Sequence, residues 1–155
     1  MTKTHAPFDR ILAQHEALNE TVQELKTYLG APRPDVEDDA AREWASGLAR
    51  RLVGLHEELN RHFQEEEASG FLGEMVADYP PARRKAKRLL AEHGQMRNDL
   101  HSLIEAALAY SEHRPTGQQR LRRWTLTIVQ RLVRHERKET DLIQRLYTAD
   151  LGEVD

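Results

Sequence analysis

The sequence predicts an all-α protein that folds as an antiparallel up-down-up-down four-helix bundle. Four segments repeat apolar residues every three or four positions, which is the spacing of one helix face. The segments have similar lengths and are joined mostly by short connections, as in such bundles. No segment alternates apolar and polar residues like a strand. The chain has 155 residues, so we expect one domain over residues 1–155 with a sizeable core.

The first helix is expected at about residues 7–29. Pro7 suits its first turn, where a helix needs no N–H donor. Gly30, Pro32 and Pro34 end it. The face predicted to be buried carries Phe8, Ile11, His15, Leu18, Val22, Leu25 and Leu29.

The second helix is expected at about residues 36–67 and is ended by Ser69 and Gly70. Its predicted buried face carries Trp44, Leu48, Leu52, Leu55, Leu59, His62 and Glu66. The connection after it is too apolar for a free linker. We expect it to pack back on the domain and cap one end of the bundle through Phe71, Leu72, Met75 and Tyr79.

The third and fourth helices are expected at about residues 81–110 and 118–148, separated by a break at residues 113–117. Pro81 opens the third helix. Its predicted face carries Ala86, Leu89, His93, Met96, Leu100, Leu103, Ala107 and Tyr110. The face of the fourth carries Leu121, Trp124, Ile128, Leu132, His135, Glu139, Leu142 and Leu146.

Composition excludes several kinds of chemistry. The chain has eight histidines and no cysteine, which rules out a disulfide framework, a thiolate zinc site, an iron–sulfur cluster and a cysteine nucleophile. Gly-rich phosphate loops and a Ser-centred elbow are also missing from the sequence. Any metal must therefore be held by nitrogen and oxygen atoms.

Charge and hydropathy indicate the surroundings of the protein. The formal net charge is −3 with both signs spread along the chain, which favours neither nucleic acid nor a membrane surface as a partner. The basic run at residues 83–88 has no aromatic residues between its cations, so we expect a solvated flank. No apolar run is long enough to span a membrane, and the first ten residues do not read as a signal peptide. We expect a cytoplasmic protein that is a monomer or a weak homodimer.

Each of the four predicted faces is interrupted by one histidine, and two of them have a glutamate four residues later, as in His62 with Glu66 and His135 with Glu139. Positions four apart lie on the same side of a helix, so both side chains can address one point. His15 and His93 lie toward the starts of their helices and the two pairs lie toward the ends of theirs. In an antiparallel bundle these levels coincide.

The predicted metal ligands are therefore His15, His62, Glu66, His93, His135 and Glu139. Four imidazoles and two carboxylates suit two metal ions, each with two nitrogens, bridged by both carboxylates. Iron, manganese and zinc all suit such a set. Histidines in a core without metal are the alternative, but burying this many polar groups unpaired would cost several kcal/mol per charge, by order of magnitude. We expect no special role for the other histidines, His5, His56, His101 and His113.

The segments AQHEAL, LNRHFQEEE, LLAEHGQM and RLVRHERKE resemble the bacterial hemerythrin-like, or HHE cation-binding, domain over about residues 8–147. The resemblance implies a non-haem di-iron pair that binds or responds to dioxygen, handles peroxide or nitric oxide, or handles iron. It leaves open a peroxide-decomposing or oxidase activity. The alternative is a helical interaction or regulatory module with a structural or mononuclear metal.

One position departs from the oxygen-carrying members, which usually have a second histidine one turn after that of the third helix. This sequence has Arg97 there. The departure removes one imidazole and leaves room for water or peroxide. We expect Arg97 to be solvated; the alternative is that it pairs with a ligand carboxylate or stabilises a bound anion. We expect Glu58 and Glu65 to lie on a solvated helix face rather than to act as extra ligands.

Overall fold

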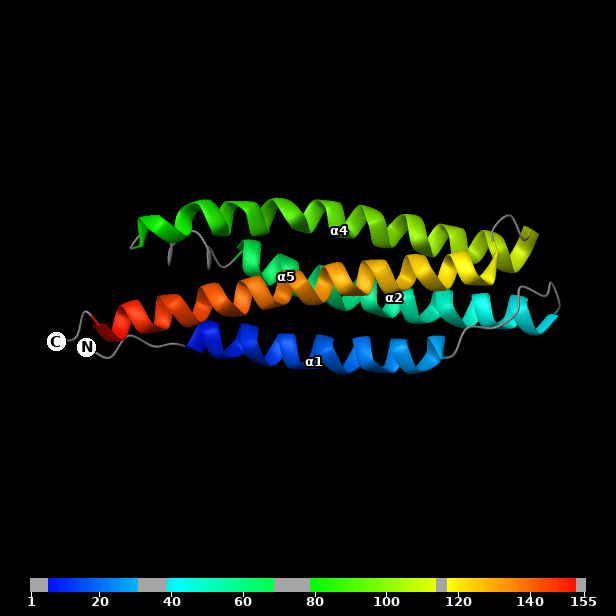
Figure 1. The fold of residues 1–155 in the computed structure, drawn as a ribbon, viewed down its shortest axis with the longest axis horizontal. Helices are drawn as coiled ribbons and strands as arrows, with labels where there is room; N and C mark the ends of the chain where they lie inside the picture. The colour runs from blue at the N-terminus through cyan, green and yellow to red at the C-terminus, as the bar shows by residue number, and fades with distance from the viewer. Residues whose placement is uncertain (1–5, 31–38, 69–78, 114–116, 153–155) are drawn as a thin grey trace.

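The computed structural model describes residues 6–30, 39–68, 79–113 and 117–152. They form the α-helices α1 (Ala6–Leu29), α2 (Asp39–Ala68), α4 (Pro80–His113) and α5 (Gln118–Gly152), with no strand among the residues described. Successive helices run in opposite directions (Figure 1). Each helix packs against its two neighbours in the order α1, α2, α4, α5 and back to α1. The predicted antiparallel four-helix bundle is confirmed.

The helix ends follow the breakers in the sequence. Gly30 has a positive φ of 55° and its N–H donates to the carbonyl of Lys26 at 3.1 Å, which closes α1 with a left-handed cap. The helix α4 continues three residues past the predicted end, to His113, because the next proline comes only at Pro115. The helix α5 likewise extends to Gly152 rather than 148. Residues 36–38 of the predicted second helix lie outside the described residues.

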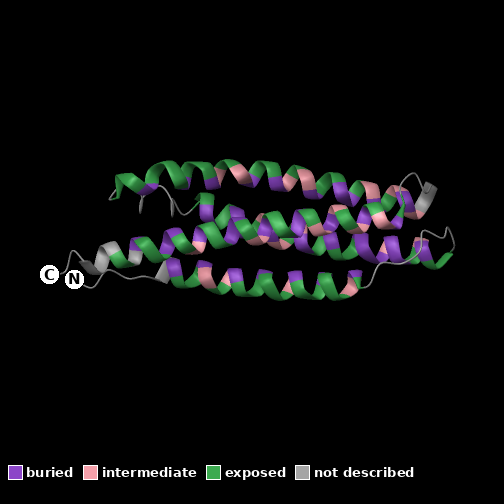
Figure 2. Ribbon diagram, in the orientation of Figure 1, coloured by how far each residue is buried: buried purple, intermediate pink, exposed green. Residues whose placement is uncertain are grey.

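The predicted buried faces are confirmed almost completely. Every residue predicted on them is buried except Trp124, which is half-buried. Purple and green alternate along each helix in Figure 2, so each helix has one inward and one outward side. The buried stripe is wider than predicted, because residues one position beside it also face the interior. They include Ala45, Phe63, Ile104, Val129 and Ile143.

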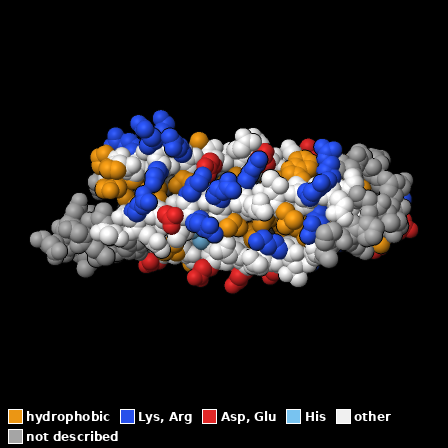
Figure 3. All heavy atoms as spheres, viewed as in Figure 1, with side chains coloured by type: hydrophobic (Ala, Val, Ile, Leu, Met, Phe, Trp, Pro, Cys, Tyr) orange, Lys and Arg blue, Asp and Glu red, His pale blue; other side chains and the backbone are white. Residues whose placement is uncertain are grey.

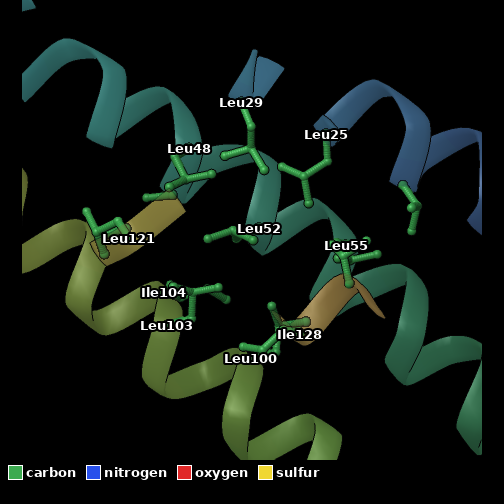
Figure 4. Packing of buried hydrophobic residues seen from close by; sticks show 14 of the residues in the cluster. Leu25, Leu29, Leu48, Leu52, Leu55, Leu100, Leu103, Ile104, Leu121 and Ile128 are labelled. Carbon is green, nitrogen blue, oxygen red and sulfur yellow. The ribbon is translucent and has the colours of Figure 1, made fainter. Parts of the chain in front are cut away.

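The apolar core is divided into two clusters. The larger cluster contains Leu48, Leu52 and Leu55 of α2 packed against leucines and isoleucines of the other helices (Figure 4). The smaller cluster comes from α1, α4 and α5 and consists of Phe8, Ile11, Ala82, Ala86, Leu89, Leu142, Ile143 and Leu146. Between them in sequence on these three helices stand the histidines predicted as ligands. The bundle therefore has a polar layer between two apolar layers.

Lysine and arginine side chains are numerous on the face formed by α4 and α5 in Figure 3. The basic residues at positions 83–85, 87 and 88 are all exposed, as predicted for a solvated flank. No helix in the described part of the chain is long and apolar enough to cross a membrane. The predicted apolar cap lies outside the described residues at Phe71, Leu72 and Met75, and Tyr79 beside it is 38% exposed.

Candidate metal centre

The six residues predicted as metal ligands meet at one level of the bundle, and all six are buried. They form two groups whose donor atoms lie within 4.8 Å of one another. One group contains His15 and His62, the other contains His93 and His135, and both contain Glu66 and Glu139. The centre thus consists of two adjoining sets of four donors, and both sets include the same two carboxylates. Each of the four helices contributes at least one donor.

Each shared carboxylate turns one oxygen toward each group. Glu66 has Oε1 2.5 Å from Nε2 of His62 and Oε2 3.1 Å from Nε2 of His93. Glu139 has Oε2 3.7 Å from Nε2 of His15, while its Oε1 contacts Nε2 of His135. This is the arrangement that two bridging carboxylates require.

The inward atoms of the centre are buried without hydrogen-bond partners. These are the Nε2 atoms of the four histidines and all four carboxylate oxygens of Glu66 and Glu139. A buried polar atom that lacks a partner costs about 1–3 kcal/mol, and more when it is charged. Eight such atoms around one point fit a pair of cations, which would satisfy all of them. The absence of thiolate suits iron, manganese or zinc, and the sets leave coordination positions for water or a small molecule.

The outward nitrogen of each histidine contacts a side chain on the preceding helix of the ring. Thus α1 supports α2, α2 supports α4, α4 supports α5, and α5 supports α1. The Nδ1 contacts are His62 to Gln14 Oε1 at 2.6 Å, His93 to Glu67 Oε1 at 3.1 Å, His135 to Glu92 Oε2 at 2.7 Å and His15 to Thr140 Oγ1 at 3.0 Å. These four partners form an outer ring that orients the imidazoles.

The outer ring also determines the tautomers. Carboxylates only accept hydrogen bonds, so Nδ1 of His93 and of His135 must carry the hydrogen. The amide nitrogen of Gln14 donates to Glu65, which leaves its oxygen to accept from His62. When these three imidazoles are neutral, the lone pair is therefore on Nε2, the atom that faces the centre. That is the tautomer a metal ligand needs.

Aromatic packing further restricts the rings. Phe63 stacks on His93 with ring centroids 3.8 Å apart and planes 8° apart. The pairs His15–His62 and His93–His135 have the same centroid separation of 5.0 Å, at interplanar angles of 67° and 63°. The two halves of the centre therefore repeat one geometry. Phe63 was missed by sequence reasoning, since it stands beside the predicted face rather than on it.

Charges in the centre influence one another strongly in the protein without metal. Burial disfavours an imidazolium, yet the carboxylates of Glu139 and Glu66 outweigh it and raise the pKa of His93 to about 9. Burial likewise opposes ionisation of Glu139, but the surrounding imidazoles of His135, His15 and His93 hold the pKa of that carboxyl well below its ordinary value. The centre therefore retains carboxylate charge at neutral pH, as cation binding requires.

Glu136 is a buried acid that sequence reasoning missed. It is 4% exposed, and its Oε1 has no hydrogen-bond partner. Burial, and then repulsion by Glu139, Glu66 and Glu58, raises its pKa to about 8. In the metal-free protein Glu136 is thus mainly a neutral carboxylic acid at pH 7. It belongs to neither donor set.

The expectation that Arg97 is solvated was wrong. Its side chain is only 28% exposed, and its guanidinium donates to both oxygens of Glu67 at 3.2 and 3.4 Å and to Asn60 Oδ1 at 3.0 Å. Its Cζ lies 5.2 Å from the centroid of the Phe63 ring. The planar fork of arginine matches a carboxylate, so Arg97 holds the outer partner of His93 in place.

The remaining polar candidates lie outside the two donor sets. Glu58 accepts a hydrogen bond from Thr21 at 2.8 Å and Glu65 contacts Gln14, so both are held by side chains of α1. His101 is 64% exposed and pairs with Glu105, while His56 contacts Asn60. His5 and the side chain of His113 lie outside the described residues.

The fold and the centre define a four-helix bundle with a buried, thiolate-free cluster of histidines and glutamates that could hold metal ions. The family model of the hemerythrin HHE cation-binding domain matches residues 5–147. The chain therefore belongs to the hemerythrin HHE cation-binding domain family. No curated protein and no solved structure matches the chain.

Proposed function

We propose that the protein is a non-haem di-iron protein of the hemerythrin type that binds or responds to dioxygen, peroxide or nitric oxide, or handles iron. The observation that carries the proposal is the pair of four-donor sets that share Glu66 and Glu139. A single structural ion would need only one set. Two adjoining sets with common carboxylates match a dinuclear site.

In this proposal His15 and His62 would hold one iron, His93 and His135 would hold the other, and Glu66 and Glu139 would contribute to both. The iron pair would supply redox chemistry toward small oxygen- or nitrogen-containing ligands. The surrounding chain excludes bulk water through the two apolar clusters and fixes each imidazole through its Nδ1 partner. Manganese and zinc are the other ions that this donor set suits.

The test is the metal content of protein purified without oxygen from iron-replete cells, followed by ultraviolet and visible spectra before and after air. We expect about two irons per chain and new absorption on exposure to air. Glu139→Gln should lose most of the iron, because a bridging ligand is lost. Glu136→Gln is the matched control three residues earlier on α5, and it should keep both irons. The proposal would be contradicted if protein from iron-replete cells contained no metal. It would also be contradicted if Glu136→Gln lost as much iron as Glu139→Gln.

An enzymatic version of the proposal is a peroxide-decomposing or oxidase activity at the same site. Arg97 in place of a further histidine supports it, because the centre then has one protein donor fewer than in the oxygen-carrying members. Peroxide turnover that is lost in Glu139→Gln and kept in Glu136→Gln would distinguish catalysis from passive binding. One tightly held ion without turnover would instead indicate the module with a structural or mononuclear metal.

The cytoplasmic location and the monomeric or weakly dimeric state stay predictions from the sequence. Cell fractionation and sedimentation of the purified chain test them.

A further inference from the structure

The two proposed ion positions have identical direct ligands. Each has two imidazole Nε2 atoms and one oxygen from each of Glu66 and Glu139. The imidazole pairs also have the same ring separation of 5.0 Å. The two positions therefore have the same kinds of direct ligand, so we examine the groups outside these ligands for a difference in affinity.

The outer ring supplies such a difference. Around the His93–His135 position both imidazoles contact carboxylates, Glu67 and Glu92. Around the His15–His62 position the corresponding partners are neutral, Gln14 and Thr140. The outer ring thus places two carboxylates beside the His93–His135 position and only neutral groups beside the His15–His62 position.

The difference falls on corresponding positions of the two halves of the chain. Gln14 and Glu92 each precede the single histidine of a helix, His15 or His93. Thr140 and Glu67 each follow the shared glutamate of a helix, Glu139 or Glu66. The two halves therefore repeat the direct ligands but not the charge that supports them.

A carboxylate that accepts the Nδ1 hydrogen makes the imidazole a more basic ligand, and loss of such a partner typically lowers metal affinity by roughly 10- to 100-fold. A neutral hydroxyl or amide oxygen has a weaker effect.

Arg97 and Lys138 pair with Glu67 and Glu92 and offset part of this charge. All four of these side chains are partly exposed, so water screens the pairs while the hydrogen bonds to the buried imidazoles remain. Glu65 accepts a hydrogen bond from the Gln14 amide, and its link to His62 runs through that amide.

We infer that the two ion positions are unequal, and that Glu67 and Glu92 make the His93–His135 position bind its ion first and more tightly. The inference rests on the proposed dinuclear site. It makes Glu67 and Glu92 positioning residues, since they act on the ion only through His93 and His135.

The test is a titration of metal-free protein with Co²⁺ alone, without oxygen and against a chromophoric chelator, to obtain two stepwise affinities. In the double variant that combines Glu67→Gln and Glu92→Gln, we expect the affinity of the first binding step to fall by about 10- to 100-fold and that of the second step much less. Thr140→Val removes a neutral partner from the other position, so it should weaken only the second step. Circular dichroism and melting of the metal-free variants show whether they are folded.

A further control separates the imidazole contact from overall charge. Glu65→Gln removes a nearby carboxylate that touches no imidazole, and it should leave the first step within about threefold of the parent protein, which is the size expected of a screened surface charge. If Glu65→Gln weakened the first step as much as the double variant with Glu67→Gln and Glu92→Gln, general electrostatics would explain the effect and the inference would fail.

The outcomes distinguish this inference from the proposed function. Two bound ions, with the first step governed by Glu67 and Glu92, support both. Two bound ions whose first step is unaffected by these variants, or is weakened by Thr140→Val, overturn the inference and leave the dinuclear site in place. Fewer than two bound ions overturn the proposed function and the inference with it.

Discussion

At the scale of single residues, the centre is defined by contacts that cross between helices. Each outer partner is a sequence neighbour of a ligand, yet it supports an imidazole on another helix: Gln14 stands before His15 but contacts His62. A charged or amide residue next to a ligand usually indicates a solvated position in a helix pattern. The signal that could have found the outer ring is its repetition, since all four partners flank predicted ligands.

Glu136 allows a prediction about pH. Its pKa of about 8 in the folded protein lies above an ordinary value of 4.5. Between these values the native state binds a proton that the unfolded chain does not, so wild-type stability falls as pH rises through this window. Glu136→Gln has no proton to bind. In metal-free protein at pH 7 it should be more stable than wild type by about 3 kcal/mol.

Urea unfolding of both metal-free proteins at several pH values measures this difference. The advantage of Glu136→Gln should be small near pH 4, should grow as pH rises and should level off above about pH 8. An advantage that is the same at pH 4 and pH 7 would show that packing rather than titration is responsible.

At the scale of elements, close packing of α1 on α2 depends on one glycine. Tyr28 of α1 donates its hydroxyl to the carbonyl of Trp44 at 2.8 Å and stacks on the Trp44 ring, with the planes 7° apart. A Cβ on Gly47 would overlap the Tyr28 hydroxyl and lie 3.0 Å from Cζ. Gly47 therefore provides the space that lets the tyrosine reach the backbone of α2.

The two glycines of α2 give a matched pair of substitutions. Gly47→Ala should destabilise the protein by about 1 kcal/mol, because losing the Tyr28 hydrogen bond and ring contact outweighs the gain in helix propensity. Gly54 is exposed with nothing near its Cβ position, so Gly54→Ala should stabilise by about 0.5–1 kcal/mol. Chemical denaturation of both variants measures the two signs. Equal stabilisation by both would mean that Tyr28 moves aside at no cost.

At the scale of the whole molecule, the apolar core of the bundle is interrupted by a buried polar layer. Six buried polar residues, those predicted as metal ligands, separate the two apolar clusters, and each of the four helices contributes at least one of them. Without cations the layer has eight buried imidazole and carboxylate atoms that face one another without making hydrogen bonds. An ion pair bound only by the folded protein would both satisfy these atoms and join all four helices.

Metal removal should therefore lower the melting temperature. At a free ion concentration about a thousand times Kd, one bound ion stabilises the fold by about 4 kcal/mol, which corresponds to roughly 10 °C for a chain of this size. Scanning calorimetry with and without a chelator measures the change. The double variant Glu66→Gln with Glu139→Gln is the control, and its melting should not respond to the chelator. A parent protein that is equally insensitive would contradict a metal bound only to the folded state.

The helices and the six converging side chains were predictable because both depend on short-range periodicity. Residues three or four apart share a helix face whatever the rest of the fold does, and antiparallel order then sets the level of His15, His62, His93 and His135. The exact ends of the helices were less predictable. The helix α4 continues to His113, because the residues after Tyr110 contain no strong signal that ends a helix.

The sequence by itself determined the four helices, their buried faces, the level of the histidines and the absence of thiolate ligands. Only the tertiary structure decided which oxygen of each shared glutamate faces which histidines, and which side chains support the imidazoles from outside. It also decided that Arg97 pairs with Glu67 instead of being solvated. The physical reason is distance along the chain: periodicity acts within one helix, whereas these contacts depend on how neighbouring helices are rotated and packed against each other.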